Sequence, residues 1–252
     1  MKINNILEDI SIATIVLTTV PLNNIFALNQ KIEIHRGQWA YPLVGAVIGL
    51  LLFASISLFA YIGMPFQVSI LISLSLGLFL TGALHEDGAA DFFDSLGGDD
   101  HASRQKILRD SRLGTYGVLG LLIVFLLKFL LLSELDSPLA LACGLIASSS
   151  LGRFSILLLV NFCGLSKQAG LTKHLEKLDN KTLILCGIFT MLWILPAGLP
   201  AVVSMILFGY ALIYLAVKFL IPFNQGLSGD ILGLFVVLVE ILALAIITVS
   251  FK

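Results

Sequence analysis

Seven apolar windows, each long enough to cross a lipid bilayer, constrain the fold of this chain more than any other feature. They cover residues 41–61, 66–84, 116–132, 139–159, 183–199, 202–220 and 231–249. A helix of about 20 apolar residues crosses the hydrocarbon core of a bilayer, which is about 30 Å thick. Hydrophobic residues make up 58% of the chain and charged residues 12%, a composition that excludes a soluble domain. The sequence predicts an all-α, polytopic integral membrane bundle of about seven transmembrane helices.

The first 40 residues precede these windows. Residues 6–20 are apolar, but Glu8 and Asp9 interrupt their start and no cleavage site with small residues follows, so we expect a retained interfacial helix that ends near Pro21. A short extra span is the alternative. The chain is predicted to form one membrane-embedded domain, 1–252. It consists of an N-terminal segment (1–40) and a transmembrane bundle (41–250) with cytoplasmic loops at 85–115, 164–182 and 221–230.

Lysine and arginine residues occur in alternate connections between the windows. They are Lys2, Lys31 and Arg36 before the first window; Arg104, Lys106, Arg109 and Arg112 after the second; Lys167, Lys173, Lys177 and Lys181 after the fourth; and Lys218 near the end of the sixth. Basic loops stay on the cytoplasmic side of a membrane. The sequence therefore predicts a multi-pass protein of the cytoplasmic (inner) membrane, with its active site facing the cytoplasm and its C-terminus outside.

A cluster of acidic residues follows the second window. Six of the 16 acidic residues lie within 86–100, and on a helix Asp87, Asp91 and Asp94 would share one face. Carboxylates this close repel each other unless a cation neutralises them, and Mg²⁺ prefers oxygen ligands and bridges to substrate phosphates. The spacing predicts a Mg²⁺ site with His85 next to it. A solvated acidic loop is the alternative.

Two charged residues lie well inside apolar windows. Arg153 is midway along the fourth window and Glu240 lies within the last. A charge inside a membrane is costly, so both side chains are expected to face the interior of the bundle or a water-filled cavity. An ion pair between them and a role in substrate binding both fit this placement. Lys128, near the end of the third window, is expected to extend its ammonium group to the interface.

Two polar segments at the predicted cytoplasmic face are further candidates. In 224–230, glycines precede Asp230 at the start of the last window. The backbone N–H groups of such a helix start favour phosphate, and Asp230 is a candidate ligand, although a simple helix cap is the alternative. Arg109 and Arg112 follow the acidic cluster, and arginine suits bidentate phosphate contacts. The preference for basic residues on the cytoplasmic side accounts for them equally well.

The motifs together resemble one known family. The run 81–98, followed by Asp110-Ser111-Arg112-Leu113-Gly114-Thr115-Tyr116-Gly117, resembles the cobalamin synthase family, the adenosylcobinamide-GDP ribazoletransferases. Tyr41-Pro42-Leu43-Val44-Gly45 and Ser228-Gly229-Asp230-Ile231-Leu232-Gly233 are similar to further motifs of that family. The resemblance covers most of the chain. Ser95 departs from the pattern, because the family more often has glycine at that position.

The resemblance implies an enzyme of cobalamin (vitamin B12) biosynthesis. The family joins adenosylcobinamide-GDP to α-ribazole, or to its 5′-phosphate, and releases GMP in a phosphoryl-type transfer that Mg²⁺ assists. The resemblance implies catalytic residues His85, Glu86, Asp87 and Asp91; Mg²⁺ ligands Asp87, Asp91 and Asp94; and substrate-binding residues Arg109, Asp110 and Arg112. Arg153 and Asp230 are further candidates for substrate binding from their positions in the sequence. The expected partners are corrinoid and nucleoside small molecules and the lipid bilayer. No nucleic acid is expected, and a homo-oligomer or an association with other cobalamin-assembly enzymes stays open.

Two other classes of function are compatible with the residues alone. Membrane phosphatidyltransferases that act on CDP-linked lipids also carry carboxylates at helical spacing, but Asp91 stands where their signature needs Ala-Arg. A cation-coupled transporter could use Arg153, Glu240 and the acidic cluster along its pathway, although such sites usually lie near the membrane midplane between repeated halves. Release of GMP by the solubilised protein would distinguish the transferase from a transporter.

Overall fold

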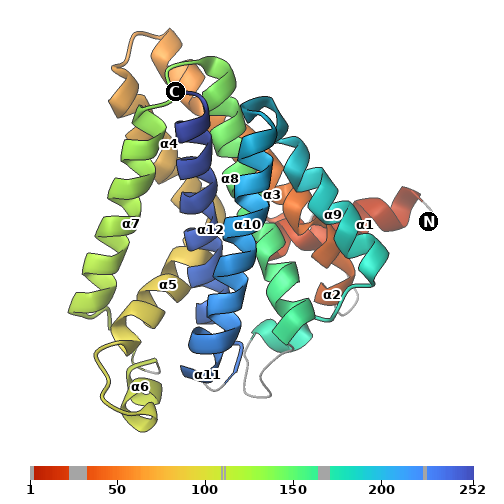
Figure 1. The fold of residues 1–252 in the computed structure, drawn as a ribbon, viewed down its shortest axis with the longest axis vertical. Helices are drawn as coiled ribbons and strands as arrows, with labels where there is room; N and C mark the ends of the chain where they lie inside the picture. The colour runs from red at the N-terminus through yellow and green to blue at the C-terminus, as the bar shows by residue number, and fades with distance from the viewer. Residues whose placement is uncertain (1–2, 23–32, 109, 111, 164–170, 224–225) are drawn as a thin grey trace.

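The chain folds into a bundle of helices in the computed structural model (Figure 1), which describes residues 3–22, 33–108, 110, 112–163, 171–223 and 226–252. No strand occurs in these ranges, and the predicted all-α membrane bundle is confirmed. The elements are α1 (Ile3–Leu17), α2 (Ile34–Gly37), η2 (Gln38–Ala40), α3 (Tyr41–Tyr61), α4 (Phe66–Thr81), α5 (Leu84–Ser95), α6 (His101–Leu108), α7 (Thr115–Ser133), α8 (Pro138–Cys163), η3 (Leu171–His174), α9 (Asn180–Leu192), η4 (Leu195–Ala197), α10 (Leu199–Leu215), η5 (Ala216–Leu220), α11 (Ile221–Phe223) and α12 (Gly229–Ser250).

Fewer helices can cross the membrane than the seven predicted. In the described part of the chain five are long and apolar enough: Ile34–Tyr61, Thr115–Ser133, Pro138–Cys163, Leu199–Phe223 and Gly229–Ser250. The bent pair of α4 and α5 adds a sixth when it is counted as one crossing; its apolar part is α4, and we place the polar α5 beyond the end of the span.

The predicted window 183–199 is the one that differs most. It contains α9, which ends at Leu192 after 13 residues, and a helix of that length covers only about 20 Å. Pro196 lies in the short turn that follows, and Gly198 (φ 92°) then redirects the chain into α10. The prolines of the segment 196–200 predict a turn there, as observed, whereas hydropathy alone overstated the length of the helix before it.

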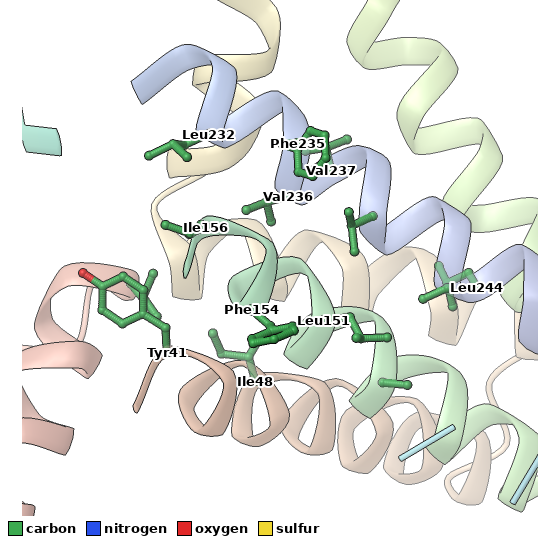
Figure 2. Packing of buried hydrophobic residues seen from close by; sticks show 14 of the residues in the cluster. Tyr41, Ile48, Leu151, Phe154, Ile156, Leu232, Phe235, Val236, Val237 and Leu244 are labelled. Atoms are coloured by element: carbon green, nitrogen blue, oxygen red, sulfur yellow. The ribbon is translucent and has the colours of Figure 1, made fainter. Parts of the chain in front are cut away.

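Helix α8 is the centre of the bundle. In its apolar window 94% of the residues are buried, against 17% in Leu199–Phe223. A Cβ atom on Gly45 or Gly49 of α3 would overlap the backbone of α8, so small residues let these two helices touch directly. Figure 2 shows side chains of α8, among them Leu151 and Ile156, lying between α3 and α12.

The N-terminal helix α1 lies crosswise to the long helices (Figure 1) and packs against the segment before α3. Asp9 of α1 is buried; it accepts a hydrogen bond from Trp39 Nε1 at 3.1 Å and pairs with Arg36 at 3.1 Å. The backbone N–H of Thr19 donates to the carbonyl of Leu80 at 2.8 Å. These contacts tie α1 to the bundle, and its position at the membrane interface stays a prediction.

Candidate active site between α5 and α12

Helix α5 begins at a sharp break in the backbone. Gly82 (φ 62°) and Ala83 (φ 52°) both adopt the left-handed conformation, and α5 leaves α4 at an angle of 91°. Glycine takes this conformation freely, whereas alanine there costs on the order of 1 kcal/mol. Because of the break, α5 runs obliquely across the bundle (Figure 1) and packs against α7 and α12.

Glycines bring α5 and the start of α12 into contact. A Cβ atom on Gly88 would lie 3.1 Å from Cα of Asp230, and one on Gly233 would lie 2.7 Å from the carbonyl oxygen of His85. Larger side chains at these positions would separate the two helices. The close approach places Asp230 near Asp87.

Asp87, Asp91 and Asp230 form a group that we call the carboxylate cluster. Burial, together with the negative charges of Asp87, Asp230 and Asp94, raises the pKa of Asp91 to about 6. Among the described residues, no lysine or arginine lies within 4 Å of the three carboxylates. The carboxylate cluster therefore has an excess of negative charge that a bound cation would neutralise.

The carboxylate cluster fits part of a Mg²⁺ site. Over the described ranges, no three His, Cys, Asp or Glu side chains are arranged as a complete metal site. Mg²⁺, however, usually takes only one or two protein carboxylates and keeps waters or binds substrate phosphates at its other positions. Of the predicted ligands, Asp87 and Asp91 lie in the cluster together with Asp230, and their binding of Mg²⁺ stays a prediction.

Asp94, the third predicted ligand, has other partners. It is 9% exposed, and its two oxygens each accept a backbone hydrogen bond at 2.7 Å, from Gly114 and from Gly117 at the start of α7. A carboxylate at a helix N-terminus is stabilised by the exposed N–H groups there. A Cβ atom on either glycine would overlap the carboxylate. The motif that follows Asp110 therefore joins α5 to α7, a role that the sequence alone did not reveal.

Glu86 lies in a buried ionic network with Lys128, Arg153 and Glu240. Lys128 Nζ is 3.5 Å from Glu86 Oε1 and 2.5 Å from Glu240 Oε2, and Arg153 pairs with the other oxygen of Glu240. The predicted pair of Arg153 and Glu240 is confirmed. The expectation that Lys128 reaches the interface is wrong: its side chain is 8% exposed, because two carboxylates inside the bundle compensate its charge.

The surroundings of Arg153 favour this pairing over contact with substrate. Arg153 lines a cavity of about 50 Å³ together with Ser148, Ser149 and the other members of the network. A cavity of that size holds one or two waters. It has no room for a nucleotide diphosphate.

A larger cavity adjoins the carboxylate cluster. Its volume is about 170 Å³, and its polar lining comes from His85, Asp87, Asp230 and Tyr41. Sequence analysis placed Tyr41 only within a resembling motif and gave it no role. The structure thus brings together two predicted catalytic residues, one predicted substrate-binding residue and one tyrosine.

The remaining predicted residues lie elsewhere. Arg109 is outside the described residues. Asp110 and Arg112 pair with each other at 2.7 Å, the Arg112 side chain is 87% exposed, and its guanidinium lowers the pKa of Asp110 to about 2. Across the described chain this pair makes no ionic contact with the carboxylate cluster. Its predicted role in binding substrate stays a prediction.

Comparison with known proteins agrees with the motifs. The family model described as cobalamin-5-phosphate synthase matches residues 9–248. The chain belongs to this family. Proteins named adenosylcobinamide-GDP ribazoletransferase are similar to it, including one from Bradyrhizobium diazoefficiens, 30% identical over 92% of this chain and 90% of the relative. One from Shewanella frigidimarina is 33% identical over 86% of this chain and 84% of the relative, and one from Azorhizobium caulinodans is 42% identical over 52% and 50%. No solved structure matches the chain. The resemblance inferred from the motifs is confirmed.

Proposed function

We propose that this enzyme joins adenosylcobinamide-GDP to α-ribazole, or to its 5′-phosphate, at the carboxylate cluster, and releases GMP. The transferase class and the place in cobalamin biosynthesis follow from membership of the family and from the names of its relatives. One observation carries the location of the site. Asp87, Asp91 and Asp230 gather from two helices beside a cavity, with no basic side chain of the described residues against them.

The chemistry requires positioning and charge neutralisation more than a covalent contribution from the protein. An oxygen of the ribose forms a bond to the phosphorus that carries the cobinamide side chain, the bond from that phosphorus to the oxygen of GMP breaks, and GMP leaves. Mg²⁺ bound by the carboxylate cluster would neutralise the diphosphate and the departing phosphate. His85 and Asp87 line the adjoining cavity, and the position of Asp87 in the carboxylate cluster supports it as the group that accepts the hydroxyl proton. Glu86 is directed instead toward Lys128.

We also propose that the carboxylate cluster faces the cytoplasm and that the membrane is the inner membrane. The multi-pass character of the chain follows from its apolar helices. The orientation is supported by the placement of α6 and its basic residues at the end of the bundle opposite the C-terminus (Figure 1). Basic segments remain on the cytoplasmic side, where nucleotide-activated substrates are made.

The test is a reaction with purified protein. Solubilised enzyme is incubated with adenosylcobinamide-GDP, α-ribazole and Mg²⁺, and the joined corrinoid and GMP are measured. Asp87→Asn and Asp230→Asn are expected to lower turnover by roughly 100-fold or more, whereas Asp136→Asn, in the connection from α7 to α8, should leave it unchanged. Normal turnover in both cluster variants would overturn the site. A transporter would release no GMP, and a phosphatidyltransferase would release CMP from a CDP-linked lipid.

A further inference from the structure

Two residues that line the cavity of about 170 Å³ beside the carboxylate cluster each have a buried polar atom without a hydrogen-bond partner. Tyr41 Oη and His85 Nε2 are buried and make no hydrogen bond within the described structure, and the two residues are 2% and 5% exposed. Both line this cavity. A buried polar atom without a partner destabilises a fold, so two such atoms in residues that line one cavity point to a ligand that can pair with them.

The rest of the lining is mainly apolar. It comes from α1, α5, α8, α12 and the segment after η3, as Val16, Leu17, Leu84, Ile156, Leu175 and Leu232. Figure 2 shows Tyr41, Ile156 and Leu232 at one end of the buried cluster. Apolar walls with one hydroxyl and one ring nitrogen suit a flat aromatic ring that carries few polar atoms.

The volume limits the size of the occupant. An apolar cavity of about 150 Å³ holds a molecule the size of benzene, and sites for larger ligands usually measure about 300–1,000 Å³. The cavity therefore accepts one small ring system and excludes a corrinoid or a whole nucleotide. Guanine presents several more donors and acceptors than the two free atoms here could satisfy. A lipid acyl chain would leave both of those atoms unpaired.

We propose that this cavity binds the aromatic base of the nucleoside substrate. This inference rests on the proposed function and adds to it the position of one substrate. Asp87 and Asp230 line the same cavity, so a nucleoside whose base occupies it has its ribose next to the carboxylate cluster. The hydroxyl then lies where the diphosphate of the second substrate is bound. Tyr41 Oη and His85 Nε2 select a base that carries ring nitrogens.

The first test removes one hydrogen-bonding group. In Tyr41→Phe, the KM for α-ribazole is expected to rise about fivefold to tenfold, the range of one lost hydrogen bond, with a smaller change in kcat and in the KM for adenosylcobinamide-GDP. The matched control is Tyr61→Phe, the same chemical change on the same helix at a side chain that is 88% exposed. It should leave all three constants unchanged.

The second test fills the cavity. Val16→Phe, from α1, should raise the KM for α-ribazole at least tenfold and abolish binding of free benzimidazole, measured by calorimetry on full-length protein in detergent. Val47→Phe is the control, because this valine of α3 is 49% exposed and lies away from the cavity. Thermal unfolding of each variant shows whether it folds. If Val16→Phe does not fold, Tyr41→Phe tests the inference by itself.

The outcomes separate this inference from the proposed function. An unchanged KM for α-ribazole in Tyr41→Phe, with normal release of GMP, overturns the assignment of the cavity and leaves the transferase function standing. If Tyr41→Phe raises only the KM for adenosylcobinamide-GDP, the inference is overturned as well, because that result assigns the cavity to the other substrate. Failure of the unaltered enzyme to release GMP counts against the proposed function. In that case, binding of benzimidazole to the unaltered protein, and its loss in Val16→Phe, would still support the cavity as a site for an aromatic base.

Discussion

Asp94 accepts a hydrogen bond from the backbone N–H of Gly117 at 2.7 Å, and its second oxygen accepts one from Gly114. The last carboxylate of α5 is thereby bound to the first turn of α7. Asp91 lies one turn earlier on the same helix, so this contact fixes the end of the helix that carries Asp87 and Asp91. The aspartates of α5 thus divide into two roles, since Asp87 and Asp91 belong to the carboxylate cluster and Asp94 anchors the helix.

Asp94→Asn is expected to lower the stability of the folded protein. An amide provides one acceptor oxygen in place of two and directs N–H groups at a backbone N–H, so we expect a loss of about 2 kcal/mol in the free energy of unfolding. Thermal unfolding in detergent measures it. Asp99→Asn, at an exposed position five residues later, is the control. Equal melting temperatures for the two variants would contradict the anchoring role.

The raised pKa of Asp91 predicts how Mg²⁺ and protons compete. Its pKa rises from 3.8 to about 6 in the folded protein, so between these values the folded state holds a proton that the unfolded state has lost. The metal-free protein should therefore lose stability as the pH rises through this window. Mg²⁺ binds the ionised form, so the rise in melting temperature on adding Mg²⁺ should be larger at about pH 7.5 than at about pH 5.

Asp91→Asn is the matched variant for this effect. It should raise the melting temperature of the metal-free protein at about pH 7.5, because it removes one of the repelling charges, and it should abolish most of the response to Mg²⁺. Asp99→Asn should respond to Mg²⁺ as the unaltered protein does. A response to Mg²⁺ that is independent of pH would show that Asp91 is not a ligand.

Much of the fold was predictable because it depends on composition within single segments. The windows 41–61, 116–132, 139–159 and 231–249 correspond closely to α3, α7, α8 and α12, since hydropathy over about 20 residues decides whether a helix can cross a membrane. The helical spacing of Asp87 and Asp91 likewise predicted that they share one face of a helix.

What could not be predicted depends on contacts between distant segments. The spacing that groups Asp94 with Asp87 and Asp91 contains no information about Gly117, which reaches Asp94 from another helix. Lys128 looked like a residue near a span end because its partners, Glu86 and Glu240, come from two other helices. The left-handed break at Ala83 directs α5 toward α7, where Glu86 and Asp94 find their partners, and an alanine gives little sign of such a conformation.

The orientation of the bundle is testable with single cysteines. Native Cys143, Cys163 and Cys186 are first replaced by serine or alanine, and cysteines are then introduced at Asp100 or Lys252. Since α6 and the C-terminus lie at opposite ends of the bundle (Figure 1), only Lys252→Cys should react with an impermeant thiol reagent in intact cells. Both should react after the membrane is permeabilised. Labelling of Asp100→Cys alone in intact cells would reverse the proposed topology.

The ionic network predicts an order of stabilities among its variants. Glu240 pairs with both Lys128 and Arg153, so Glu240→Gln leaves two buried cations with reduced compensation and should cost about 3–5 kcal/mol. Lys128→Met should cost less, because Glu240 keeps Arg153. The double variant Glu240→Gln with Arg153→Met should recover part of the loss, since it removes one of the uncompensated charges.

A matched control for these variants is the exposed pair of Glu134 and Lys252, which lie 2.7 Å apart. Solvent screens such a pair, so Glu134→Gln should have little effect on thermal unfolding.

Turnover is measured beside stability, because Arg153 was also a candidate for binding substrate. Two results together would contradict a structural role for the ionic network. The first is a rise in the KM for adenosylcobinamide-GDP in Arg153→Met without a lower melting temperature. The second is that the changes in the free energy of unfolding caused by Arg153→Met and Glu240→Gln are additive. Non-additive losses in stability, with KM unchanged, are the expected result, because each charge in the network is buried and relies on the others for its compensation.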